Sequence, residues 1–275
     1  MIVNRRVQAL LESSTRFGEV REFASIDSTN RWVSDAAARG AGEGLVAVAD
    51  YQSAGRGRLG RAWEAPAGTC LMASILLRPD LPVSRLGLVT NAVALSARDA
   101  CWAVAGVRPG LKWPNDLMVG DMKLAGILAE SAGGAGSGSG SGSGAGSGSG
   151  GGGRAVVVGI GLNVTAAPPG AATLAGISSA ASAGASIDRG ELLGALLMAL
   201  ESRYGRWDAV AAEYREACVT VGRRIRATRP VGDLVGVARG VDDDGRLVVV
   251  DDAGALHTVS AGDVVHVRPS DQWPS

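Results

Sequence analysis

The sequence predicts an α+β protein in which a sheet is backed by helices and followed by a small β-barrel. Apolar runs of strand length alternate with longer segments of helical periodicity as far as residue 217. Beyond that point the pattern changes to short apolar runs separated by glycine and aspartate turns. A chain of 275 residues can bury one sizeable core and a smaller second one. We therefore divide it into a larger domain over 1–217 and a barrel over 218–270.

Three segments have the apolar spacing of helices. Residues 28–40 begin with Ser28 or Thr29 as the N-cap and stop at Gly40. Residues 84–106 carry one apolar stripe, and residues 186–217 form two helical stretches with a buried leucine face. The stripe consists of Leu86, Val89, Val93, Ala97, Ala100 and Val104, and the leucine face of Leu192, Leu193, Leu196, Leu197 and Leu200.

Short apolar runs at 44–50, 68–78, 123–130 and 155–164 predict strands, and 111–116 predicts a strand that runs into a turn. Between the last two strands lies a glycine- and serine-rich segment, residues 133–153, which cannot bury apolar surface. We interpret it as the tip of a long hairpin that carries no chemistry. The sequence leaves open whether this insertion is natural or engineered.

Composition excludes several classes of function. The formal net charge is zero, so no overall basic field attracts nucleic acid or anionic lipid. No apolar run is long enough for a membrane helix or a signal peptide. Cys70, Cys101 and Cys218 lack the spacing of metal ligands, and His257 and His266 fall in predicted barrel strands as satisfied or solvated side chains. We expect a cytoplasmic protein without membrane contact.

A loop of alternating glycines and arginines, SAGRGRLGRAW at 53–63, follows the first predicted strand. It does not match the P-loop pattern. Glycines allow the backbone to approach a ligand closely, arginines clamp carboxylates and phosphates, and Trp63 offers a stacking face. The loop alone is consistent with an anion-binding lid, an RNA contact or a plain surface loop.

Only two of the 27 basic residues are lysines, Lys112 and Lys123, and both lie in LKWPNDLMVGDMKLAGIL. The two lysines either remain by chance in an arginine-rich chain or mark a site that needs a compact ammonium, which would resist replacement by arginine. If the strands at 111–116 and 123–130 are neighbours, these cations and the carboxylate of Asp116 converge. Asp116 then either positions Mg²⁺ near phosphates or serves as a turn-forming residue.

Taken together, these motifs resemble the biotin protein ligase family. The resemblance runs from about residue 23 to 268, outside the Gly/Ser segment, and its order is highly specific. It rests on STN at 28–30, Gln52, GRGRLGRAW at 55–63, KWPND at 112–116, KLAGIL at 123–128 and GIGLNV at 159–164. It implies a catalytic domain like that of class II tRNA synthetases, with a mixed or mostly antiparallel sheet, followed by an SH3-like barrel.

The resemblance also implies a two-step reaction. ATP and biotin would form biotinoyl-5′-AMP, and a lysine of a biotin carboxyl carrier protein would then displace AMP. Mg²⁺ is the implied cofactor. Some members carry an N-terminal DNA-binding domain of about 60 residues, and the 27 residues before Ser28 are too few for one. We therefore expect no DNA partner.

The site roles follow from the matching positions. The implied catalytic residues are Lys123, Arg58 and Asp116, with Lys123 as the main charge stabiliser and Asp116 as a metal or acceptor-lysine contact. The implied biotin contacts are Ser28, Thr29, Asn30, Gln52, Gly55, Arg56, Gly57, Arg58, Lys123 and Gly126. The implied nucleotide contacts are Arg56, Arg58, Arg61, Trp63, Lys112, Asn115 and Asn163.

Two other functions fit parts of the sequence. A lipoate or octanoyl ligase shares the fold type, but the pairing of GRGRLGR with KWPND argues against it. An RNA-binding module could use the arginine loop and the barrel, but the zero net charge and the lack of a second basic or aromatic patch argue against that class.

Overall fold

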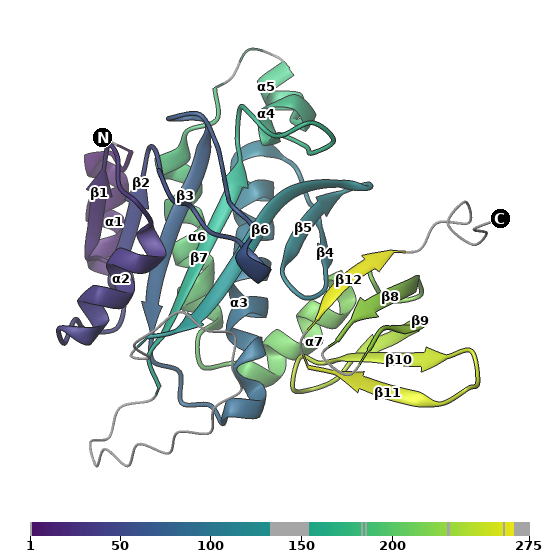
Figure 1. The fold of residues 1–275 in the computed structure, drawn as a ribbon. Helices are drawn as coiled ribbons and strands as arrows, with labels where there is room; N and C mark the ends of the chain where they lie inside the picture. Colours follow the sequence, from purple (N-terminus) through teal and green to yellow (C-terminus); the bar gives the residue numbers. More distant parts are fainter. Residues whose placement is uncertain are drawn as a thin grey trace.

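The larger domain is built on a mixed, mostly antiparallel sheet (Figure 1). The structure, a computed structural model, describes residues 2–132, 154–182, 184, 186–229, 232–260 and 262–266. Within them, seven strands run in the order β1-β2-β3-β7-β6-β5-β4, and only the β1–β2 pair is parallel. The strands are β1 (Val20–Phe23), β2 (Val46–Ala49), β3 (Cys70–Leu77), β4 (Gly110–Lys112), β5 (Asp116–Val119), β6 (Met122–Ser131) and β7 (Val156–Asn163).

Most strands coincide with the predicted apolar runs. The runs at 44–50, 68–78, 123–130 and 155–164 are β2, β3, β6 and β7, and LKWPND forms β4, a turn and the start of β5. β6 and β7 pair as the two sides of the predicted hairpin, whose tip at 133–153 lies outside the described residues. β1 was not predicted, because VREF contains only two apolar residues and its partner β2 is distant in the chain.

Helices cover both faces of the sheet, and those of one face enclose the main core (Figure 1). α2 contacts β2, β3 and β7 on one face, while α3 and α6 pack against the other. The helices are α1 (Arg5–Ser14), α2 (Thr29–Ala38), α3 (Gly87–Ala105), α4 (Leu174–Ile177), α5 (Ser179–Ser182), α6 (Arg189–Arg203) and α7 (Trp207–Ala217), with 3-10 turns at Arg58–Gly60 and Val83–Arg85.

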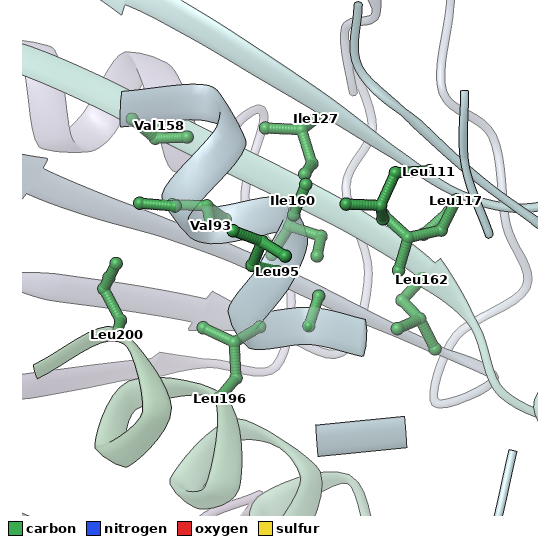
Figure 2. Close-up of a cluster of buried hydrophobic side chains, with 14 of the residues drawn as sticks. Val93, Leu95, Leu111, Leu117, Ile127, Val158, Ile160, Leu162, Leu196 and Leu200 are labelled. Atoms are coloured by element: carbon green, nitrogen blue, oxygen red, sulfur yellow. The ribbon is translucent and has the colours of Figure 1, made fainter. Parts of the chain in front are cut away.

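The main core lies between the sheet and helices α3 and α6 (Figure 2). Val93 and Leu95 of α3 lie beside Ile160 of β7, Leu162 of β7 lies near Leu117, and Leu196 comes from α6. α3 is buried on most of its circumference because the sheet, α6 and α7 surround it. The predicted leucine face of α6 is fully buried. Four residues of the predicted stripe of α3 are buried, and Leu86 and Val104 are partly buried.

The C-terminal residues form the predicted SH3-like unit. Its five described strands run in the antiparallel order β11-β10-β9-β8-β12. His257 contacts Asp251 at 2.7 Å and His266 contacts Thr220 at 3.2 Å, so both histidines have polar partners as predicted. The strands are β8 (Arg224–Thr228), β9 (Leu234–Val241), β10 (Leu247–Asp251), β11 (Leu256–Val259) and β12 (Asp263–His266).

Among the described helices, none has the length and apolar character needed to cross a membrane.

Candidate active site

A pocket of about 230 Å³ lies on the α2 face of the sheet. Its walls are the start of α2, the arginine loop, strands β5, β6 and β7, and Asp263 at the start of β12. Thirteen of the predicted site residues line it: Ser28, Thr29, Asn30, Gln52, Arg56, Gly57, Arg58, Arg61, Trp63, Asn115, Asp116, Lys123 and Gly126.

The first turn of α2 supplies one polar end of the pocket. Ser28 caps the helix, since its Oγ accepts a hydrogen bond from the backbone N–H of Arg31 at 3.4 Å. Capping fixes the following two residues, Thr29 and Asn30, with both side chains buried toward the sheet. The backbone N–H of Thr29 donates to Oε1 of Gln52 at 2.7 Å. All four predicted polar contacts therefore converge on one point.

The arginine loop closes on itself as a small hairpin. The backbone N–H of Trp63 donates to the carbonyl of Gly55 at 2.9 Å, and that of Gly57 donates to the carbonyl of Arg61 at 2.7 Å. Leu59 at the tip has a φ of 56° and is 70% exposed. A positive φ is strained for leucine and is uncommon outside turns and functional loops.

Trp63 lies against the sheet where two strands have glycines. A Cβ added to Gly161 of β7 would lie 2.3 Å from Cε2 of Trp63, and one added to its cross-strand partner Gly126 would lie 3.4 Å from Cζ3. Asn30 uses a third glycine in the same way, because a Cβ on Gly159 would lie 2.1 Å from its Oδ1. These glycines are therefore required for close approach.

The three loop arginines connect the loop to other parts of the molecule. Arg56 Nη2 lies 3.2 Å from Oε2 of Glu130 on β6. Arg58 donates to Oδ1 of Asn115 at 3.1 Å and to the carbonyl of Gly262 at 3.0 Å. Burial lowers the pKa of the Arg58 guanidinium, and the charges of Asp263 and Asp116 oppose that shift.

Arg61 forms an ion pair with Asp263 of the barrel. The arginine loop is thus held between β6, the KWPND turn and the barrel.

Lys123 and Asp116 meet in the pocket as the sequence predicted for neighbouring strands. β5 and β6 pair directly, and Nζ of Lys123 lies 2.6 Å from Oδ1 of Asp116 as an ion pair without a directed hydrogen bond. The register shifts between Leu117 and Met118, and this irregularity allows Lys123 to share a face with Gly126. The ammonium lies 5.9 Å from the centroid of the Trp63 ring.

Residues 22–141 match the biotin/lipoate A/B protein ligase family, and residues 220–267 match the biotin protein ligase C-terminal domain. A biotin--[acetyl-CoA-carboxylase] ligase of Mycobacterium tuberculosis is 38% identical over 94% of this chain and 93% of that protein. The chain belongs to the biotin protein ligase family. A second ligase of that name, from Paracoccus denitrificans, is 33% identical over 84% of this chain and 94% of its own length.

Solved structures of the ligase family share the fold. The biotin protein ligase of Aquifex aeolicus, solved in complex with biotin and ATP, has a TM-score of 0.73, with 92% of this chain and all of that chain covered. Its sequence is 24% identical. A biotin protein ligase of Leishmania major, in complex with biotinyl-5-AMP, has a TM-score of 0.58 at 22% identity, with 88% of this chain and 99% of that chain covered. Both confirm the expected α+β architecture.

Three predicted site residues of this family member do not line the pocket. Gly55 borders an adjoining hollow, where a Cβ would lie 2.4 Å from the carbonyl oxygen of Trp63. Asn163 is buried and donates to the carbonyl of Ala172 at 3.1 Å. Lys112 lies on β4, where its charge acts on His266 of the barrel. Their suggested ligand roles stay predictions.

Several residues of the site were not predicted from the sequence. Ser74 and Glu130 hold Asn30 from strands β3 and β6, and Asp263 reaches the pocket from the barrel. Gly159 and Gly161 had a weak signal, since glycines two apart in a strand share one face.

The described residues offer few ligands for a resident metal. No three Asp, Glu, His or Cys side chains gather there as a metal-binding group. Asp116, the residue suggested for Mg²⁺, faces the ammonium of Lys123. Mg²⁺ usually binds proteins through one or two carboxylates together with substrate phosphates. The site therefore fits Mg²⁺ that arrives with a nucleotide better than a metal held by the protein alone.

Proposed function

We propose that this chain activates biotin with ATP and transfers the biotinoyl group to a lysine of a biotin carboxyl carrier protein. The observation that carries the proposal is the pocket itself. It joins a neutral polar end, formed by α2 and Gln52, to a cationic end formed by Lys123 and the loop arginines. A neutral heterocycle that bears a carboxylate tail, together with a polyphosphate, would match these two ends.

In the first step, a carboxylate oxygen of biotin attacks the α-phosphorus of ATP. The bond to the β-phosphate oxygen breaks, and pyrophosphate leaves with the electron pair. Two anions must meet, so preorganised cations lower the barrier. We assign this role to Lys123, supported by Arg56 and Arg58. Trp63 is proposed to stack on the adenine, which its position beside the strand glycines favours.

In the second step, the ε-amine of the acceptor lysine attacks the acyl carbon. An amide forms, the acyl–phosphate bond breaks, and AMP leaves. The amine gives up a proton to solvent, and Asp116, the carboxylate paired with Lys123, lines this end of the pocket. We propose that Asp116 orients the acceptor amine once ligands have reorganised the pair. The mixed anhydride must be protected from water, and the arginine loop is suited to cover it.

We further propose that Mg²⁺ enters as part of the substrate, bound to the ATP phosphates. When bound, it neutralises phosphate charge. The three cysteines are buried and free in the part of the chain that the structure describes, as is usual in reducing compartments. This favours a cytoplasmic site of action.

ATP–pyrophosphate exchange tests the first step. The wild-type protein should exchange labelled pyrophosphate into ATP with biotin and not with lipoate or without acid. Exchange that requires lipoate would assign the chain to the other branch of the family, and no exchange with either acid would refute the proposal. Transfer is tested with a recombinant carrier domain, where mutation of its acceptor lysine should abolish labelling.

A further inference from the structure

A chain of hydrogen bonds runs beneath the polar end of the pocket. Nδ2 of Asn30 donates to Oε2 of Glu130 at 2.8 Å. On its other side, Oδ1 of Asn30 lies 2.6 Å from the hydroxyl of Ser74, which lies 2.7 Å from the hydroxyl of Thr29. Ser74 is fully buried, and it faces Gly159 across β3 and β7. None of the motifs in the sequence includes Ser74 or Glu130.

The carboxylate at one end fixes the direction of this chain. A carboxylate accepts only, so the Asn30 amide turns its nitrogen to Glu130 and its oxygen to Ser74. That oxygen also accepts only, so the single proton of Ser74 is donated to it. The proton of Thr29 then goes to Ser74 or to Oε1 of Gln52, which lies 3.0 Å away. In both cases it stays within the protein.

The consequence is a defined polarity at the pocket surface. The hydroxyl of Thr29 offers lone pairs to a ligand. Gln52 uses Oε1 to accept from the backbone N–H of Thr29, which leaves its Nε2 as a donor on a side chain that lines both the pocket and the adjoining hollow. An acceptor beside a donor complements a urea, which carries an N–H beside a carbonyl. A dithiolane ring carries neither group.

We infer that Ser74 and Glu130 are positioning residues that set the pocket to recognise the ureido ring of biotin. The inference rests on the proposed function, and it names the residues that select a urea at that same site. Neither side chain need contact the ligand, since each acts through Asn30 and Thr29. Glu130 has a second partner, Arg56, at 3.2 Å, so the same carboxylate joins urea recognition to the arginine loop.

The Ser74→Ala variant is the first test. Without the hydroxyl, Asn30 loses its donor and Thr29 can direct its proton elsewhere. In ATP–pyrophosphate exchange we expect KM for biotin to rise roughly tenfold, as for the loss of one well-placed buried hydrogen bond. KM for ATP should change less than about twofold. Desthiobiotin, which keeps the urea and lacks the thioether ring, should lose as much as biotin.

Ser96→Ala is the matched control. Ser96 is equally buried, but its hydroxyl donates to the carbonyl of Ala92 within α3, away from the pocket. Its KM for biotin should equal that of the wild type. An equal KM in the Ser74→Ala variant, or an equal rise for biotin and ATP, would overturn the inference.

A swap of acid and amide is the sharper test. Asn30→Asp places two carboxylates side by side and should lower kcat/KM for biotin roughly a hundredfold. Adding Glu130→Gln restores a donor facing an acceptor, and Ser74 again donates to the oxygen at position 30. The double variant should recover to within about tenfold of wild type. A double variant no better than Asn30→Asp alone would overturn the inference.

Glu201→Gln controls for loss of an arginine–carboxylate pair. Glu201 pairs with Arg16 on the surface, and its side chain is 27% exposed against 30% for Glu130. It should behave as wild type in every exchange assay. Wild-type protein that fails to exchange with biotin would refute the proposed function. Active wild type with an unaffected Ser74→Ala variant would refute only the role of Ser74 and Glu130.

Discussion

At the scale of single residues, the rarity of lysine is the most informative feature of the chain. Lys123 lies in the pocket and Lys112 does not, although both stood out equally in the sequence. The surroundings of Lys123 favour a lysine over an arginine at this position. A Cβ on Gly126 would lie 3.0 Å from Nζ and 3.1 Å from Cε of Lys123, so the ammonium is packed against backbone. A guanidinium is broader and planar, so it would not place its charge at the same point.

Lys123→Arg should therefore lose most of the adenylation rate although the charge is kept. We expect biotin-dependent pyrophosphate exchange to fall roughly a hundredfold in kcat, comparable to the loss of one preorganised electrostatic contact. Lys112→Arg is the comparison, since it makes the same change on β4, and it should stay within about threefold of wild type. Near wild-type exchange in Lys123→Arg would show that any cation suffices.

At the scale of elements, the pocket depends on two hydrogen-bonded strands that have glycine at selected positions. Gly126 of β6 pairs with Gly161 of β7, and Gly159 follows on the same face. Three absent side chains leave room for Trp63 and Asn30 to rest on the sheet. The strands still fold because their other face carries Ile127, Val158 and Ile160 into the core (Figure 2).

Gly161→Ala should disturb the site more than the fold. The new Cβ would lie 2.3 Å from Cε2 of Trp63, so the indole must move away from the sheet. We expect KM for ATP to rise roughly tenfold and unfolding free energy to drop by about 1–2 kcal/mol, measured by exchange kinetics and urea denaturation. Gly240→Ala on β9 is the control, since a Cβ there meets nothing within 4 Å. Equal kinetics in both variants would contradict this role of Gly161.

Elements with a local sequence pattern could be predicted, and contacts between residues far apart in the chain could not. β3 and β7 are continuous apolar runs, and α2 carries its own cap, so local patterns sufficed. Ser74 and Glu130 stand 44 and 100 residues from Asn30, and neither has a local signal. Lys123 was assigned to the site from its motif alone. Simple strand alternation would place Lys123 and Gly126 on opposite faces, and only the register shift between β5 and β6 brings them to the same face.

At the scale of the whole molecule, the barrel completes the pocket. The carbonyl of Gly262 accepts from Arg58, and Asp263 pairs with Arg61 across 202 residues of sequence. The sequence indicated a separate barrel and left its task open, because contacts between domains have no periodicity that a sequence pattern can reveal. The indole N–H of Trp113 also donates to the carbonyl of Gly245 at 2.9 Å, so the KWPND turn is anchored to the barrel.

This junction gives the molecule a pH-dependent stability. His266 of β12 contacts Thr220, whose hydroxyl also accepts from the backbone N–H of Trp113 at 3.0 Å. Burial, with the charges of Lys112 and Arg223, lowers the pKa of His266 to about 4, and Asp121 opposes the shift. The unfolded chain therefore binds more protons than the folded one between about pH 6.5 and 4. Stability is fully present above that window and is lost as pH falls through it.

His266→Gln should remove the contribution of His266 to the pH dependence of the unfolding free energy. The glutamine amide can still form a hydrogen bond with Thr220. Between pH 7 and pH 4.5 the wild type should lose about 1 kcal/mol more unfolding free energy than the variant, a value reduced for the half-buried ring. Urea denaturation at the two pH values measures the difference. The chain has only 2 histidines, so the ring signal absent from the NMR spectrum of the variant is that of His266 and reports its pKa directly. A ring that titrates near pH 6.5, or parallel slopes for both proteins, would contradict the prediction, because the junction would then open to water before the barrel unfolds.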